Sequence, residues 1–134
     1  MNHSSPATMD LLHDIAVALR KDGPIEAGTM FRSPGLRTGS KIVLFLGHDD
    51  RLIVKLPRPR AIALIDDGTA EPVTMGTRTM REWVAIPASV NLDTTRTIWI
   101  KIAREAFRYV RQAAGAGASP RDSHDRDATY PDDL

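Results

Sequence analysis

The fold is decided by residues 42–56, which read Ile42-Val43-Leu44-Phe45-Leu46, then Gly47-His48-Asp49-Asp50, then Arg51-Leu52-Ile53-Val54-Lys55-Leu56. The first five residues are continuously apolar, which is typical of a strand buried on both faces. The last six alternate, so that Leu52, Val54 and Leu56 face one side while Ile53 and Lys55 face the other. Because glycine and aspartate between them favour a tight turn, we predict a β-hairpin here.

Apolar residues at helical spacing occur both before and directly after this hairpin. Upstream, they recur every three to four positions over Met9–Lys21, which predicts a helix that Thr8 or Asp10 caps. Downstream, a shorter helix is predicted over Pro59–Asp67. Proline suits the first turn of a helix, and Gly68 suits the position after its end.

The last helix is the clearest element of the sequence. We expect Asp93, Thr94 or Thr95 to cap it and the glycine-rich segment from Gly115 to end it. Its apolar stripe consists of Trp99, Ile102, Ala103, Ala106, Phe107 and Val110. This spacing repeats once per helical turn, so the helix buries one side and exposes the other.

The remaining ordered segments are predicted to be strands. Ile25–Arg32 is a short strand, and Ser33-Pro34-Gly35 is a turn that reverses the chain. Glu71–Thr74 is a weak edge strand and Trp83–Ile86 a stronger one. The order is therefore α-β-β-β-β-α-β-β-α. It predicts a two-layer α+β fold, an antiparallel sheet of about five to six strands packed by an N-terminal helix, a short middle helix and a long C-terminal helix.

The composition excludes several classes of protein. The chain has 134 residues, of which 42% are apolar and 26% charged, and its formal net charge is +1. These values fit one domain with a hydrophobic core and exclude collagen, coiled coil and wholesale disorder. No run of about 18 apolar residues occurs, so we expect no membrane span and no membrane partner. Because cysteine is absent, disulfides, thiolate metal sites and cysteine nucleophiles are excluded.

Charge is distributed unevenly along the chain. Residues 1–114 hold 16 lysines and arginines against 12 acidic residues, whereas residues 115–134 hold 2 against 5. We expect a flexible leader over residues 1–8, one mildly basic domain over residues 9–114 and a disordered acidic tail over residues 115–134. Charged residues interrupt the apolar run near the N-terminus, so no signal peptide is apparent and a cytoplasmic location is expected. Arginine outnumbers lysine 14 to 4, as is typical of GC-rich bacterial genomes.

Several segments together resemble a known family. Met30-Phe31, Pro34-Gly35-Leu36, Gly39-Ser40-Lys41-Ile42 and the strand ending in Lys55-Leu56-Pro57 are similar to the start of the TfoX N-terminal-like domain. Met80-Arg81-Glu82-Trp83-Val84-Ala85-Ile86-Pro87 and Trp99 with Ala103-Arg104-Glu105-Ala106 resemble the related MmcQ/YjbR-like proteins. The resemblance covers residues 9–112. It implies a small two-layer α+β domain and an association with competence regulation and DNA binding, and it carries over no catalytic residue.

Two sets of basic residues are candidates for binding a polyanion. The first set, Lys55, Arg58 and Arg60, lies where a strand turns into a helix, and guanidinium groups beside a helix N-terminus can hold a phosphate. The second set is a row on the polar side of the last helix, which can lie along a nucleic acid backbone; it consists of Lys101, Arg104, Arg108 and Arg111. The alternative for both sets is a solvated surface, in which Glu105 pairs with a neighbouring cation. A polyanion partner is favoured if the two sets share one face.

A third candidate combines Arg78, Arg81 and Trp83, because an exposed tryptophan beside arginines can stack on nucleic acid bases. The alternative is that Trp83 belongs to the core. The four histidines, His3, His13, His48 and His124, do not have the spacing of metal ligands. The paired carboxylates Asp49-Asp50 and Asp66-Asp67 lie at turns, where aspartate is favoured for local hydrogen bonds. We therefore predict no catalytic residues, no metal and no cofactor.

The sequence thus favours a small binding module without enzymatic activity. One hypothesis is a DNA-binding or regulatory module, supported by the resemblance and by the basic sets. The other hypothesis is a protein-interaction or homodimerisation module that pairs sheet edges or helices, supported by the weak edge strand Glu71–Thr74. An enzyme or small-ligand binder with a cleft between sheet and helices is the least favoured.

Overall fold

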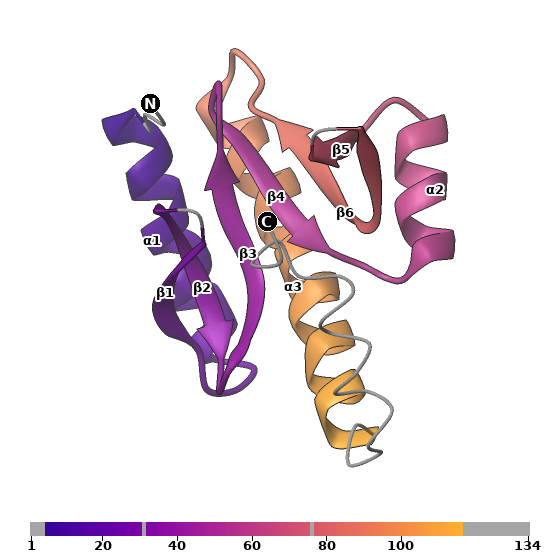
Figure 1. Cartoon of the computed structure of the whole chain (residues 1–134). Helices are drawn as coiled ribbons and strands as arrows, with labels where there is room; N and C mark the ends of the chain where they lie inside the picture. Colours follow the sequence, from indigo (N-terminus) through magenta and orange to yellow (C-terminus); the bar gives the residue numbers. More distant parts are fainter. Residues whose placement is uncertain (1–4, 31, 76, 117–134) are drawn as a thin grey trace.

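The computed structural model describes residues 5–30, 32–75 and 77–116 (Figure 1). These residues form three helices and six strands in the predicted order. The elements are α1 (Pro6–Arg20), β1 (Glu26–Met30), β2 (Ser33–Thr38), β3 (Lys41–Gly47), β4 (Arg51–Lys55), α2 (Arg58–Asp66), β5 (Glu71–Met75), β6 (Arg78–Pro87) and α3 (Leu92–Ala116). The α+β prediction is therefore confirmed. No helix within the described residues is long and apolar enough to cross a membrane.

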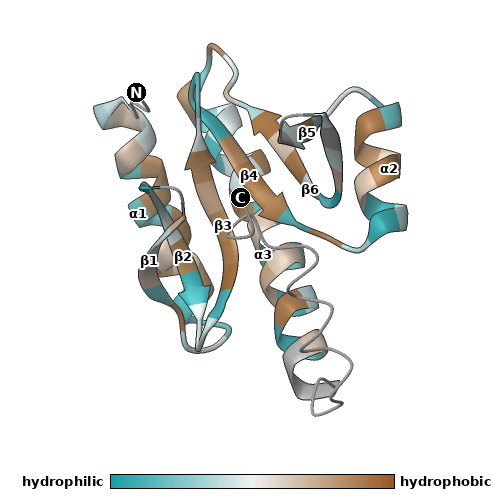
Figure 2. Ribbon diagram, in the orientation of Figure 1, coloured by the Kyte–Doolittle hydropathy of each residue, from teal (hydrophilic) through white to brown (hydrophobic). Residues whose placement is uncertain are grey.

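The six strands form one antiparallel sheet in the order β1-β2-β3-β4-β6-β5. The predicted hairpin is its centre, with Leu44 opposite Val54 and Leu46 opposite Leu52. Asp49 and Asp50 adopt φ angles of 58° and 54° in its turn, a left-handed conformation that aspartate tolerates better than most residues. Figure 2 shows hydrophobic residues concentrated along β3 and β4.

The prediction of a turn at residues 33–35 was wrong. These residues open β2, and the chain reverses just before them, where Arg32 has a φ of 66° and Met30 pairs with Ser33. Gly35 serves close packing rather than a turn. A Cβ there would overlap the Leu44 carbonyl oxygen and lie 2.8 Å from the Cβ of Phe45. Glycine at this position therefore allows close packing of β2 against β3 and does not mark a reversal of the chain.

The helix boundaries differ from the predictions at their N-termini. Ser5, rather than Thr8 or Asp10, caps α1, and its hydroxyl accepts a hydrogen bond of 3.2 Å from the Thr8 N–H. Part of the predicted leader is therefore helical, whereas its residues 1–4 lie outside the described residues. Asn91 caps α3 by accepting a 2.9 Å hydrogen bond from the Thr94 N–H. In both helices the cap lies upstream of the predicted one, because several Ser, Thr, Asn and Asp residues compete for that position.

The predicted acidic tail falls almost wholly outside the described residues. Its first two residues, Gly115 and Ala116, are the last residues of α3, so the helix extends slightly beyond the predicted break. The strand predicted over Trp83–Ile86 is longer than expected: β6 begins at Arg78 and contributes ten residues to the sheet.

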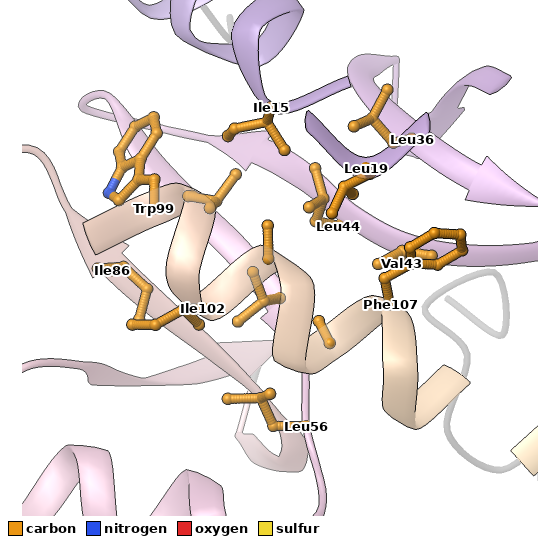
Figure 3. Close-up of a cluster of buried hydrophobic side chains, with 14 of the residues drawn as sticks. Ile15, Leu19, Leu36, Val43, Leu44, Leu56, Ile86, Trp99, Ile102 and Phe107 are labelled. Carbon is orange, nitrogen blue, oxygen red and sulfur yellow. The ribbon is translucent and has the colours of Figure 1, made fainter. Parts of the chain in front are cut away.

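All three helices contribute to one core on one face of the sheet. Figure 1 shows α1 and α3 side by side behind the strands, and α2 packs against β6. Trp99, Ile102 and Phe107 of α3 meet side chains of α1 and of the sheet in this core (Figure 3). The opposite face carries a smaller cluster built on Met30, Phe45 and Trp83. The long helix α3 is thus anchored by its apolar side, and its polar side is presented outward.

Candidate functional site

A hollow lined by four cations lies between the end of α1 and the C-terminal half of α3. The hollow has a volume of about 690 Å³ and is lined by Lys21, Asp22, Arg104, Phe107, Arg108, Arg111 and Gln112. We call these seven residues the basic hollow. Three of the four cations predicted on the last helix, Arg104, Arg108 and Arg111, therefore meet a fourth, Lys21, that comes from α1.

Two of the arginines are held by Asp22. The Arg111 Nη1 donates a 2.7 Å hydrogen bond to the Asp22 carbonyl oxygen, and the Arg104 Nε lies 3.4 Å from the Asp22 Oδ2. The Arg111 guanidinium also lies over the Phe107 ring, 5.4 Å from its centroid, as in a cation–π contact. Arg111 is thereby positioned by two groups, the Asp22 carbonyl and the Phe107 ring.

Gly23 provides the space for this arrangement. A Cβ at this position would overlap the Arg111 Nη1 and lie 3.3 Å from the Phe107 ring. Because glycine has no side chain, the guanidinium can cross the chain directly after α1 and reach the Asp22 carbonyl. The glycine that follows α1 therefore shapes the hollow.

The charges of the basic hollow are not balanced. Four cations face one carboxylate, that of Asp22. Within the described residues, neither Lys21 nor Arg108 forms an ion pair, and both are exposed to solvent. Lys101, one turn before Arg104, is also exposed. An open hollow with uncompensated positive charge attracts anions and favours a ligand that carries several negative charges.

The structure divides the other predicted basic set. Arg60 forms a bidentate ion pair with Glu105 of α3, with Nε–Oε1 and Nη2–Oε2 distances of 2.7 and 3.1 Å. The hydrogen bond to Glu105 raises the pKa of the Arg60 guanidinium above its ordinary value. Arg58 is exposed in the first turn of α2. The predicted pairing of Glu105 with Lys101 or Arg108 does not occur, because the partner comes from another helix.

Lys55 lies on the other face of the sheet. Its Nζ is 5.8 Å from the centroid of the Trp83 ring, and Trp83 belongs to the smaller cluster opposite the helices. The sheet itself therefore separates Lys55 from the cations of α3. Lys55 therefore does not share a face with the cations of α3, whereas Arg60 of the same predicted set contacts α3 through Glu105.

Trp83 is a core residue, and its interpretation as a stacking platform is wrong. Only 2% of it is exposed, and its ring packs edge-on against Phe45 at a centroid distance of 5.5 Å. Arg81 is exposed on β6, whereas the side chain of Arg78 lies outside the described part of the structure. Aromatic stacking on bases therefore has no support at this position.

A second hollow, of about 330 Å³, lies on the face of the sheet opposite the helices. Its floor is largely apolar and includes Phe45, Ile53 and Val73. Arg51 reaches its rim, but its Nε forms an ion pair of 3.0 Å with Glu71. This hollow does not gather uncompensated charge, so it differs in kind from the basic hollow.

Comparison with protein-family models, with curated proteins and with solved structures gives no match for this chain. The resemblance to the TfoX N-terminal-like domain therefore stays a prediction from the sequence.

The sequence did not indicate that Lys21, Asp22 and Gln112 belong with the arginines of α3. Lys21 fits the end of α1 simply as a cation near the negative end of a helix dipole. The only signal that could have linked them is the glycine after α1, which permits close approach by another element. That signal does not say which element approaches.

Proposed function

We propose that this protein is a small, non-catalytic module that binds the phosphate backbone of nucleic acid through the basic hollow. The observation that carries the proposal is the convergence of four cations from two helices on one open hollow with a single carboxylate. Phosphate contacts of this kind supply affinity and position a protein on nucleic acid without reading its sequence.

The spacing of the arginines supports a strand of phosphates as the ligand. Arg104, Arg108 and Arg111 lie on one helix, and the first and last are seven positions apart, or about 10.5 Å along its axis. One strand of duplex DNA presents a phosphate roughly every 3.4 Å of its axis, so about three phosphates fall within this length. The association of the resembled family with DNA binding points in the same direction.

The test is fluorescence anisotropy of a labelled DNA duplex at several salt concentrations. If the four cations of the hollow each contact a phosphate, the logarithm of the binding constant falls with the logarithm of salt concentration with a slope of about −3.6. Replacing two of them, as Arg104→Gln with Arg108→Gln, should reduce the slope to about −1.8. Absence of binding at low salt would contradict the proposal.

The matched control is Arg96→Gln, which removes an arginine from the same helix. Arg96 is bound by Asp14 and Asp93, each at 3.1 Å, and does not line the hollow. Its loss should leave the slope unchanged. An equal reduction in the control would show that binding depends on net charge alone rather than on the hollow.

The alternative is a protein-interaction or homodimer module that pairs a sheet edge. Strand β5 does lie at the edge of the sheet. However, Pro72 removes a hydrogen-bond donor from it, and its register shifts between Pro72 and Val73. Both features disfavour the addition of another strand. Light scattering that found a stable dimer would favour this alternative over a monomeric nucleic-acid binder.

A further inference from the structure

We infer that Asp22 is an internal counter-anion, whose carboxylate occupies the position of a ligand phosphate and weakens binding until the phosphate displaces it. The inference rests on the proposed function and goes beyond it by naming the group that sets the affinity of the basic hollow. It is built on the different ways in which the two ends of Asp22, its carbonyl and its carboxylate, contact the arginines.

The carbonyl end of Asp22 is a fixed contact. It accepts the 2.7 Å hydrogen bond from Arg111, whose guanidinium also lies against the Phe107 ring. A backbone carbonyl cannot rotate away as a side chain can, so Arg111 stays in place when the Asp22 carboxylate moves. The hollow therefore keeps one positioned cation whether or not the carboxylate is present.

The carboxylate end of Asp22 is a weak contact. It reaches Arg104 at a single Nε–Oδ2 distance of 3.4 Å, and the two side chains are 44% and 46% exposed. By contrast, Glu105 binds Arg60 through two bonds of 2.7 and 3.1 Å. Exposed single-contact ion pairs contribute little stability because water and salt screen them. A backbone phosphodiester carries one negative charge, as the carboxylate does, but neighbouring phosphates of the same strand can also contact the other cations of the hollow. A nucleic acid strand can therefore replace the carboxylate at Arg104.

The Asp22 carboxylate acts on binding in two ways. It competes for Arg104, and its negative charge repels an incoming phosphate. A unit charge about 4 Å away in water corresponds to roughly a fivefold change in a binding constant. Removing the charge while keeping the shape of the side chain, as in Asp22→Asn, should therefore strengthen DNA binding about fivefold at low salt. The Asp22 carbonyl, and with it the position of Arg111, is unaffected by this substitution.

The chain offers a closely matched control in Asp14→Asn. Asp14 lies on α1, whereas Asp22 follows its end, and Asp14 likewise pairs with an arginine of α3, Arg96, at 3.1 Å, with side chains 41% and 44% exposed. The two substitutions change the net charge equally and each remove one ion pair to an arginine of α3. They differ in that Asp22 lines the basic hollow and Asp14 does not, and in that Arg96 keeps a second carboxylate partner, Asp93.

The experiment measures the affinity of the full chain and of both variants for the same labelled duplex by anisotropy at low salt. Thermal unfolding of each variant checks that both remain folded. We expect Asp22→Asn to bind about fivefold more tightly than the unchanged protein and Asp14→Asn to change affinity less than twofold. Adding Arg104→Gln to Asp22→Asn should remove most of the gain, because Arg104 is the group that the carboxylate occupies.

Each outcome bears on a separate statement. If the unchanged protein binds DNA but Asp22→Asn does not bind more tightly, or gains no more than Asp14→Asn, the inference about Asp22 is overturned and the proposed function stands. If the unchanged protein and every variant fail to bind, the proposed function falls and this inference falls with it. If only Asp22→Asn binds measurably, the inference that the Asp22 carboxylate opposes binding is supported, whereas the proposed function of the unchanged protein is contradicted.

Discussion

The two ends of the contact between α1 and α3 use the same residue types for different results. Near the start of α3, Arg96 lies between two carboxylates, Asp14 and Asp93, each at 3.1 Å. Near its C-terminal end, three arginines and a lysine line a hollow with the single carboxylate of Asp22, which among the described residues pairs only with Arg104. At the first end the positive charge is balanced by carboxylates and links two helices. At the second end positive charge is in excess over negative charge. The ratio of cations to carboxylates, rather than the presence of arginine, therefore marks the candidate site.

The two ends of the contact between α1 and α3 differ in charge but are alike in the packing of their buried side chains. Trp99 lies under the first end and Phe107 under the second, and their exposed fractions are 0% and 1% (Figure 3). Both side chains join the core that α1, α3 and the sheet form together. The basic hollow is thus anchored as firmly as the compensated end. Its position relative to α1 is set by the core and does not depend on the Asp22–Arg104 ion pair.

The largest expected effect tests whether the two ends are in fact equally anchored. Trp99→Ala and Phe107→Ala should each lower the free energy of unfolding by about 3–5 kcal/mol, because each leaves a large cavity in the core. Urea unfolding of both variants measures the loss. As a control, Ile62→Ala at an exposed position of α2 should lower the free energy of unfolding by less than about 0.5 kcal/mol. A far smaller loss for Phe107→Ala than for Trp99→Ala would show that the C-terminal end of α3 is loosely packed.

A smaller effect is expected at Asp50, which ties the β3–β4 turn to the start of α1. Its Oδ1 accepts hydrogen bonds from the Thr8 hydroxyl at 2.8 Å and the Ser5 N–H at 3.3 Å. The hydrogen bond from Thr8 is the main reason that the pKa of the Asp50 carboxyl lies below its ordinary value of 3.8. Asp50→Asn should lower the free energy of unfolding at neutral pH by about 1–2 kcal/mol.

The pH dependence of this effect follows from the direction of the pKa shift. Because the folded pKa is lowered, the stabilisation by ionised Asp50 is fully present above pH 3.8 and is lost as the pH falls through the folded pKa. The difference between the unchanged protein and Asp50→Asn should therefore shrink at acidic pH. Unfolding curves between neutral pH and the acid range measure it. A difference that stays constant down to the acid limit would contradict this account of Asp50.

The smallest expected effect concerns the Arg60–Glu105 pair, which is a compensated pair close to the basic end of α3. A double-mutant cycle with Arg60→Gln and Glu105→Gln should give a coupling energy of about 0.5–1 kcal/mol, because both side chains are only partly buried. Arg60→Gln should leave the salt dependence of DNA binding unchanged. A reduced slope would mean that Arg60 leaves Glu105 to contact the ligand, and the proposed boundary of the site would move to α2.

The strongest sequence patterns identified the elements well, and the weakest predictions were those of turns and caps. The alternation in residues 51–56 correctly placed Leu52 and Val54 on one face of the strand, because successive side chains of a strand alternate between two faces. The structure shows that this face is the one that the helices cover. Ser33-Pro34-Gly35 was misread as a turn, because the same residue types serve turns and crowded strand positions. The candidate site was predicted only in part. Its arginines were predicted, whereas its carboxylate and its lysine were not.

By itself the sequence determined the element order, the apolar stripe of α3 and the arginine row on the opposite side of that helix, because periodicity within one element is a local property of the chain. Only the tertiary structure decided which charges meet. Packing of α1 against α3 brings Asp22 close to Arg104 and Arg111. The position of α2 allows Arg60 to form an ion pair with Glu105. The sheet separates Lys55 from the cations of α3. Electrostatic interactions depend on distance in space, and residues far apart in the chain come within that distance only when the core has assembled.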